Sequence, residues 1–278
     1  MKRLTLILSI LCSLAFVGCN SDYYLANSYL NKFERGSDKA TETIYVRMPQ
    51  GLIHTNSSLN DVPGFMFMSV EEQDSVIASK TAILDKLDDS IFMNQFASLF
   101  LFTLSRTQMP IVLVPADAAM PAADNQHLVV DFVQMEADEY IEPHRSDFST
   151  RKGLRYSYDY ELRHFALNLW LQFGAGDSSV YFKGDEVAEQ FSGTVTALRD
   201  GRADLKTHFD RINVNDAYTL ARRMGYQCAV LFVEKMLTDH VRDVKGANEF
   251  YFLYDPRFNA IDEVVPISEA SSWGFEKL

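Results

Sequence analysis

Apolar and polar residues alternate over several segments of the chain, which is the pattern of strands that bury one face. The longest such segment is 155–173, where every second residue from Phe165 to Phe173 is large and apolar. The other segments with a strand pattern are 43–48, 111–114, 128–136, 180–182 and 191–198. Residues 174–177 and Asp200-Gly201 predict turns between neighbouring strands.

Two further segments, about 69–108 and about 215–241, repeat apolar residues at the three- and four-residue steps of a helix. Ser69 and Glu72 have the spacing of a capping box, and Asp88 to Ser90 could cap again, so the first segment is one helix or two. Ile91–Leu104 is apolar nearly all round, which predicts a buried helix. The expected buried stripe of the last helix is Ala217, Leu220, Ala221, Met224, Cys228, Leu231 and Phe232.

The order of these elements is strand, helix, several strands joined by hairpin turns, and helix. This order favours an α+β fold in which a mixed, largely antiparallel sheet packs with two long helices. We expect a single globular domain over residues 42–262 and a C-terminal tail over 263–278.

The N-terminus has the layout of an export signal. Lys2 and Arg3 precede an apolar run from Leu4 to Val17, which is shorter than the roughly 20 residues of a membrane-spanning helix. Phe16-Val17-Gly18-Cys19 resembles a bacterial lipobox, although Phe16 stands where the family usually has an aliphatic residue. The resemblance implies a signal peptide over residues 1–18 and a diacylglyceryl group on Cys19. The alternatives are an ordinary secretory signal, cleaved near Ala15 or Gly18, and an uncut signal anchor.

Acylation at Cys19 would hold the protein on a membrane, because two or more acyl chains make a stable anchor. The residue after the cysteine is Asn20. An Asp at this position would resemble the mark that retains lipoproteins in the inner membrane. We therefore expect this protein in the outer membrane of a Gram-negative envelope. The protein would face the periplasm or the cell surface. Residues 19–41 are then a lipidated, flexible tether, in which a short helix through 23–33 would add nothing to the core.

Charge and cysteine content narrow the classes of partner. The chain has 38 acidic and 26 basic residues, and loss of Lys2 and Arg3 with the signal leaves 24 − 38 = −14. Such a surface repels phosphate backbones, so we expect no nucleic acid partner. Cys228 is the cysteine that remains besides Cys19 after cleavage, which excludes an internal disulfide in the mature chain.

Motifs for catalysis are missing from the sequence. It contains no G-x-S-x-G elbow, phosphate loop, dinucleotide fingerprint, H-E-x-x-H or C-x-x-C, and its six histidines are scattered singly. We therefore expect no catalytic residue, no metal ligand, no cofactor and no enzymatic activity. Three weaker patterns have a structural interpretation that we favour over a functional one. The first is the acidic stretch Glu136, Asp138, Glu139 and Glu142 beside His144, which is either a calcium site or a solvated strand end. The second is the carboxylate pair Asp159 and Glu161, which is either a site of acid–base chemistry or a polar strand start. The third is the ladder Tyr156, Tyr158 and Tyr160, which either binds a ligand or packs.

The combination of lipobox, tether and one α+β domain is similar in layout to accessory lipoproteins of the Gram-negative envelope. Examples are activators of peptidoglycan synthases, auxiliary lipoproteins of lipid transport and the amino-terminal domain of the Tol-system periplasmic protein. This resemblance implies a non-catalytic, membrane-anchored lipoprotein that binds a partner protein or supports assembly of an envelope complex. The alternative is a lipid-anchored ligand-binding protein or hydrolase. An exposed apolar patch favours the first, and a deep pocket with convergent polar groups favours the second.

The aromatic run near the C-terminus is the candidate partner-binding surface. It consists of Phe250, Tyr251, Phe252, Leu253 and Tyr254. Full cover by two layers is unexpected so late in the chain, so one row of these side chains would be exposed. A simple edge strand packed on the core is the favoured alternative.

Overall fold

The computed structural model describes residues 21–33, 42–122, 127–150, 153, 155–174, 179–198, 202–246, 249–267 and 276–277. The signal segment, Cys19 and residues 34–41 of the expected tether lie outside these residues.

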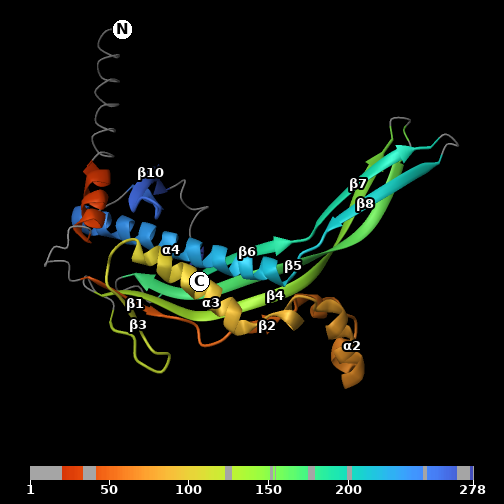
Figure 1. Ribbon diagram of the computed structural model, residues 1–278, viewed down its shortest axis with the longest axis horizontal. Helices are drawn as coiled ribbons and strands as arrows, with labels where there is room; N and C mark the ends of the chain where they lie inside the picture. The colour runs from red at the N-terminus through yellow and green to blue at the C-terminus, as the bar shows by residue number, and fades with distance from the viewer. Residues whose placement is uncertain are drawn as a thin grey trace, which may run out of the picture.

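Within the described residues, seven strands form a mixed sheet, and Figure 1 shows how they are arranged. Its order is β11-β6-β5-β4-β1-β3, with β2 beside β4. The strands are β1 (Thr43–Arg47), β2 (Ile53–Thr55), β3 (Ile111–Leu113), β4 (His127–Ser149), β5 (Arg155–Gly174), β6 (Tyr181–Ala188) and β11 (Glu276–Lys277). β1 runs parallel to β3 and β4, and β2 runs parallel to β4, whereas β4, β5, β6 and β11 pair antiparallel. The predicted α+β fold with a mixed sheet is confirmed.

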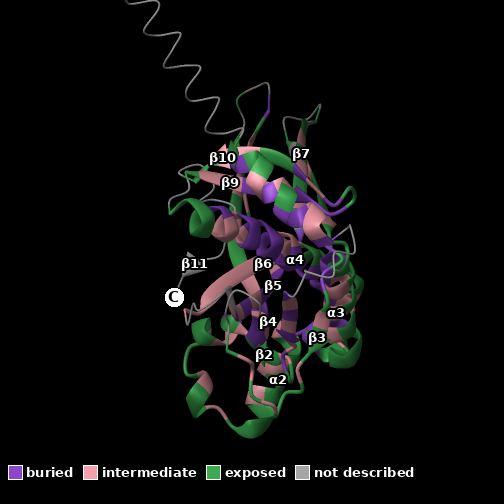
Figure 2. Ribbon diagram, turned by 90° about the vertical axis from the view of Figure 1, so that its left-hand side faces the viewer, coloured by how far each residue is buried: buried purple, intermediate pink, exposed green. Residues whose placement is uncertain are grey.

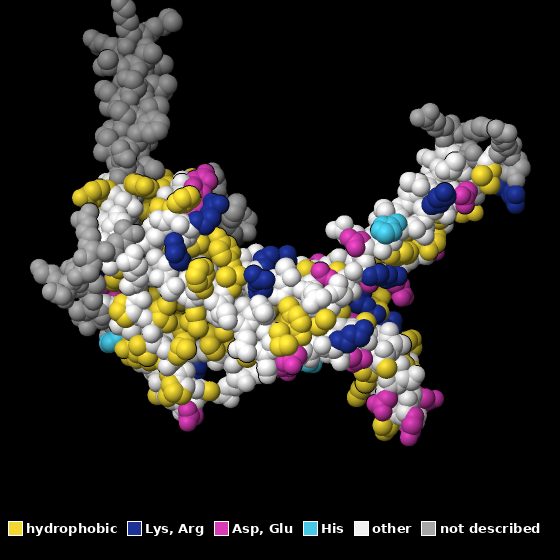
Figure 3. Space-filling view, viewed as in Figure 1, with side chains coloured by type: hydrophobic (Ala, Val, Ile, Leu, Met, Phe, Trp, Pro, Cys, Tyr) yellow, Lys and Arg dark blue, Asp and Glu magenta, His cyan; other side chains and the backbone are white. Residues whose placement is uncertain are grey.

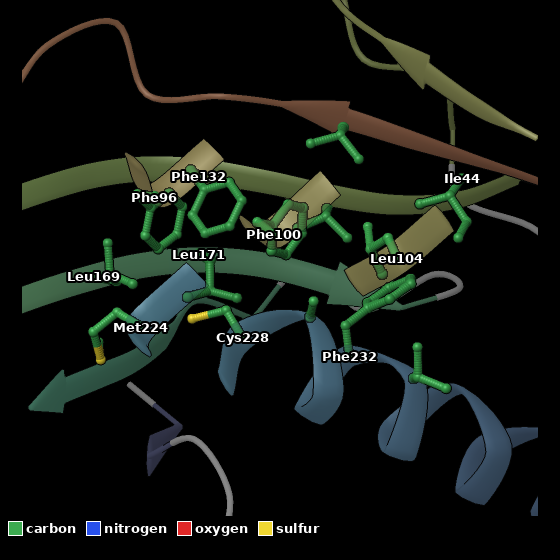
Figure 4. Close-up of a cluster of buried hydrophobic side chains, with 14 of the residues drawn as sticks. Ile44, Phe96, Phe100, Leu104, Phe132, Leu169, Leu171, Met224, Cys228 and Phe232 are labelled. Carbon is green, nitrogen blue, oxygen red and sulfur yellow. The ribbon is translucent and has the colours of Figure 1, made fainter. Parts of the chain in front are cut away.

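Two long helices cover one face of this sheet. They are α3 (Asp89–Ser105) and α4 (Val214–Lys245), and Figure 4 shows side chains from both meeting those of β1, β4 and β5. All seven residues of the predicted α4 stripe are buried. The helix starts two residues earlier than expected because Asn213 and Asp216 form a capping box there.

Close approach of the two helices depends on one glycine. A Cβ atom at Gly225 of α4 would lie 2.3 Å from the backbone oxygen of Phe96 in α3. No side chain fits at that distance, so glycine permits this crossing.

The segment 69–108 forms two helices rather than one. The capping box of Ser69 and Glu72 starts α2 (Val70–Lys80), and the Asp88 side chain accepts from the Ile91 amide to start α3. A short helical turn, η3 (Leu84–Lys86), lies between them. The expectation that Ile91–Leu104 is buried all round is wrong, because Ile91 is 45% and Phe102 is 61% exposed. The sheet and α4 cover only the face of α3 that carries Phe92, Phe96 and Phe100.

Beyond the helices, the sheet continues as an arm (Figure 1). β4 extends far past the predicted end at residue 136 and pairs with β5 as far as Ser149 opposite Arg155. A hairpin of β7 (Gln190–Ala197) and β8 (Ala203–Asp210) lies beside this extension. Tyr158 and Tyr160 stack on Phe191, with ring centroids 5.6 and 3.9 Å apart. Tyr158 and Tyr160 of the ladder therefore pack against the β7–β8 hairpin, whereas Tyr156 is 44% exposed.

The first part of the expected tether belongs to the core, so the prediction that it adds nothing is wrong. Residues 21–33 form a helix, on which Ala26, Tyr29, Leu30 and Phe33 are buried. The Tyr29 ring stacks on that of His240 in α4, with centroids 3.9 Å apart. The apolar residues of this helix share one face, and the sequence alone did not indicate that α4 would cover it. No described helix combines the length and apolar content of a membrane span.

The aromatic run near the C-terminus forms β9 (Phe250–Asp255), which pairs antiparallel with β10 (Ala260–Pro266) in a separate two-stranded sheet. Phe252 and Tyr254 are buried, and none of the five predicted partner-binding residues is fully exposed. The expectation that one row of these side chains is exposed is therefore wrong, and the alternative of a strand packed on the core is confirmed. Figure 2 shows β9 and β10 close to α4, which supplies the cover.

Candidate functional site

The face of the sheet that α3 and α4 leave uncovered carries polar side chains from β4, β5 and β6. Side chains alternate along each strand, and the register sets Tyr140 of β4 opposite His164 of β5, and His164 opposite Ala188 of β6. Two and four residues further along β4, Glu142 and His144 point to the same face. The strands thus gather residues that are about twenty positions apart in the sequence.

Glu142, His144 and His164 form a compact group on this face, and we call it the histidine cluster. The Glu142 Oε2 atom lies 3.6 Å from His144 Nε2 and 3.7 Å from His164 Nε2. Among the described residues, it is the one group of three potential metal ligands whose donor atoms all lie within 4.8 Å of one another.

The two histidines are part of a stack of aromatic rings. Tyr140 stacks on His164 at 4.8 Å, His164 lies 6.3 Å from His144, and His144 lies 5.7 Å from Tyr160. His164 is only 8% exposed. Neither of its ring nitrogens has a hydrogen-bond partner, and the same is true of Nε2 of His144. Buried polar atoms without partners are rare, so this cluster calls for an explanation.

Glu186 of β6 lies on the other side of His164. Its Oε2 atom is 3.5 Å from His164 Nδ1, and it accepts a hydrogen bond from the Tyr140 hydroxyl. Burial, and then the neighbouring Glu186 carboxylate, raise the pKa of Tyr140 well above its ordinary value. The hydroxyl therefore stays protonated and keeps donating to Glu186.

An open cavity of about 710 Å³ adjoins the cluster. Its lining includes Tyr140, Glu142 and Glu186 from the site. It also includes Asp138 and Asp185, and Asp185 pairs with Arg223 at 2.8 Å. The cavity is shallow and acidic, so it is suited to a small cation with its water rather than to an apolar ligand.

The acidic stretch of β4 does not assemble into a calcium site. Glu139 faces the helices, where it accepts from the amides of residues 82–84 and pairs with Arg163. Asp138 accepts from Ser57, and Glu136 accepts from Thr55. Alternation along the strand puts Glu139 on the opposite face from Glu136, Asp138 and Glu142. The expected solvated strand end is wrong, because β4 continues to Ser149 and both Asp138 and Glu139 are buried.

A second candidate is a projection on the far side of β2. It comprises η2 (Phe65–Phe67) and α2, and we call it the α2 projection. Phe67 is 93%, Met66 81% and Val70 68% exposed, and α2 has no buried residue. Figure 3 shows hydrophobic and acidic side chains together on this part of the surface.

No family model and no curated protein matches the chain. Among solved structures, it is similar to a neuraminyllactose-binding hemagglutinin homolog from Helicobacter pylori. The identity is 12% and the TM-score 0.32, over 75% of this chain and 91% of the other. Nothing about the function of this chain follows from a match at that TM-score.

Sequence reasoning missed the α2 projection, and it named Glu142 and His144 of the histidine cluster as part of a possible calcium site without joining His164 to them. It treated the histidines as isolated, although a hairpin centred near residue 152 would have paired residue 140 with 164 and residue 144 with 160. Gly153, with φ of 81°, marks the turn, and the polar residues 149–153 were the available signal. The predicted lipidation residue, Cys19, lies outside the described residues.

Proposed function

We propose that the chain is a lipid-anchored protein of the bacterial cell envelope that binds a partner protein without catalysis. The resemblance to a lipobox supports an acyl anchor at Cys19 on the outer membrane, facing the periplasm or the cell surface. The observation that carries the partner-binding role is the exposure of Met66 and Phe67 on the α2 projection.

Leaving these two side chains in water has an energetic cost. Burial of a Phe or Met side chain stabilises a protein by about 1.5–3 kcal/mol. Met66 and Phe67 are adjacent and exposed, so neither contributes this stabilisation. Exposed large apolar residues that stand together mark binding sites more often than scattered ones do. Val70, the exposed first residue of α2, adds to this apolar surface.

The charge around this surface indicates the kind of partner. Glu71, Glu72 and Asp74 are exposed on α2, and Lys80 is the basic residue of its last turn. A protein that offers an apolar pocket with a basic rim would complement both features. The helix of residues 21–33, which follows the proposed anchor, and the α2 projection lie at different ends of the molecule in Figure 1. This separation supports binding at a distance from the membrane.

Site-specific photocrosslinking in living cells tests the partner surface. A photoreactive amino acid at Phe67 should give one discrete adduct with an envelope protein. The matched control is Phe258, which is 76% exposed in the turn between β9 and β10 and should give none. Met66→Ser should abolish the adduct from position 67 without lowering the melting temperature. No adduct from position 67, or the same adduct from position 258, would refute the proposal.

Acylation is tested separately. Cys19→Ser should abolish labelling by a palmitate analogue and release the protein from membranes, because the acyl chains are its anchor. A serine variant that stays labelled would show that another residue carries the lipid.

A further inference from the structure

We propose that Glu142, His144 and His164 bind one divalent transition-metal ion, for which Zn²⁺ is the probe. The proposal does not rest on the partner-binding role, because the cluster lies on the uncovered sheet face and not on the α2 projection. It gives a ligand role to two of the three buried ring nitrogens that have no hydrogen-bond partner, Nε2 of His144 and Nε2 of His164.

The spacing of the donor atoms fits a tetrahedral ion. Zinc lies about 2.0–2.1 Å from imidazole nitrogen and carboxylate oxygen, so two ligands of a tetrahedron are roughly 3.3–3.4 Å apart. The Glu142 oxygen is 3.6 Å from one histidine Nε2 atom and 3.7 Å from the other. All three donor atoms lie within 4.8 Å of one another, so the two histidine rings would move toward each other by up to about 1.4 Å to close the site.

The donor types select the class of ion. Two imidazoles and one carboxylate suit zinc and its first-row neighbours, whereas calcium and magnesium prefer six or more oxygens, many of them water. Two histidines with one glutamate also leave a fourth position for water. The acidic cavity next to Glu142 supplies the room for it.

The surroundings of His164 resemble those of a metal ligand. A ligating histidine usually presents its other ring nitrogen to a carboxylate, which fixes the tautomer and the orientation of the ring. Here Nε2 faces Glu142 and Nδ1 faces Glu186, 3.5 Å away. The Tyr140 hydroxyl holds Glu186 in place by a hydrogen bond. Glu186 is thus a positioning residue for the ligand.

The competing explanation is that both histidines serve only as rings in the stack between Tyr140 and Tyr160. Glu142→Gln separates the two explanations, since it removes the charged ligand but leaves every ring in place. Side chains of Glu142 and His144 are 50% and 36% exposed, so variants there should fold.

The experiment measures zinc binding by the full chain in detergent, after metal removal with a chelator. Isothermal titration with Zn²⁺ should give one ion per chain, and Zn²⁺ should raise the melting temperature. Glu142→Gln and His144→Ala should each weaken binding at least tenfold, and Glu186→Gln should weaken it about 10–100-fold. The exposed His208→Ala is the matched control and should bind as the unmodified chain does.

Co²⁺ gives an independent readout, because its visible absorption reports four-coordinate geometry and nitrogen ligation. The unmodified chain and His208→Ala should develop that spectrum, and Glu142→Gln and His144→Ala should not. The proposal is overturned if the chain binds no Zn²⁺. It is equally overturned if Glu142→Gln and His144→Ala, shown to be folded by circular dichroism, bind Zn²⁺ as tightly as the control.

Discussion

Replacement of Glu139 by Gln should destabilise the protein strongly, because this carboxylate holds the segment between α2 and α3 against the sheet. Glu139 is fully buried on β4. Its Oε1 atom accepts from the Ala82 amide at 2.8 Å, and its Oε2 atom accepts from the Ile83 and Leu84 amides at 3.0 and 2.9 Å. Arg163, which also donates to the Lys80 carbonyl, completes the ion pair.

The magnitude follows from these partners. Glutamine keeps one oxygen and turns an NH₂ group toward at least one backbone N–H, so a donor faces a donor. An unsatisfied buried group costs about 1–3 kcal/mol. Arg163 also loses its charge partner, and breaking a buried pair by removing one member costs about 3–5 kcal/mol. We expect the free energy of unfolding to fall by about 4 kcal/mol.

Urea unfolding at neutral pH, followed by circular dichroism, measures this loss. The control is Asp147→Asn, a carboxylate on the same strand whose side chain is 77% exposed, which should change stability by less than about 0.5 kcal/mol. Amide exchange should also become faster at residues 82–84 in the Glu139 variant. A loss below about 1 kcal/mol, the range of surface ion pairs, would refute the reasoning.

Three further predictions concern how buried residues affect the free energy of unfolding. Gly225→Ala forces a methyl group against the Phe96 carbonyl and should cost about 3 kcal/mol in urea unfolding, whereas Gly51→Ala, with open space around it, should cost little. Leu30→Ala should cost about 3 kcal/mol if the helix of residues 21–33 belongs to the core. Burial raises the pKa of Glu234 to about 7 against the hydrogen bonds from Tyr254 and Tyr251. The folded chain then keeps a proton that the unfolded chain loses near pH 4.5, so stability should fall by up to roughly 3 kcal/mol as pH rises from 4.5 to 7. Glu234→Gln should flatten that profile, and an unchanged profile would show that Glu234 does not titrate there.

Local patterns in the sequence determined where several of the helices and strands begin, although β4 runs past its predicted end. The Ser69 and Glu72 pair and the Asp88 side chain start α2 and α3, because capping uses residues within one turn. The stripe of α4 and the alternation of β5 were also correct, since side chains on one face of an element recur with its own period. The fold class followed from the order of those elements.

Tertiary structure alone decided which of those faces are covered. Residues 21–33 and Ile91–Leu104 both carry apolar side chains, yet α4 buries the first while Ile91 and Phe102 of the second stay in water. Periodicity reports that a face is apolar, but burial depends on what packs against it. For the same reason, no pattern in the sequence predicted that Met66 and Phe67 would be exposed.

The histidine cluster depended on register. His144 and His164 are twenty residues apart, and they meet because β4 and β5 pair about a turn near residue 152. Moving the register by one residue would send His164 and its neighbours to the opposite face of the strand pair. The sequence by itself determined which residues each strand presents, and only the pairing of the strands determined that a glutamate and two histidines would share one place.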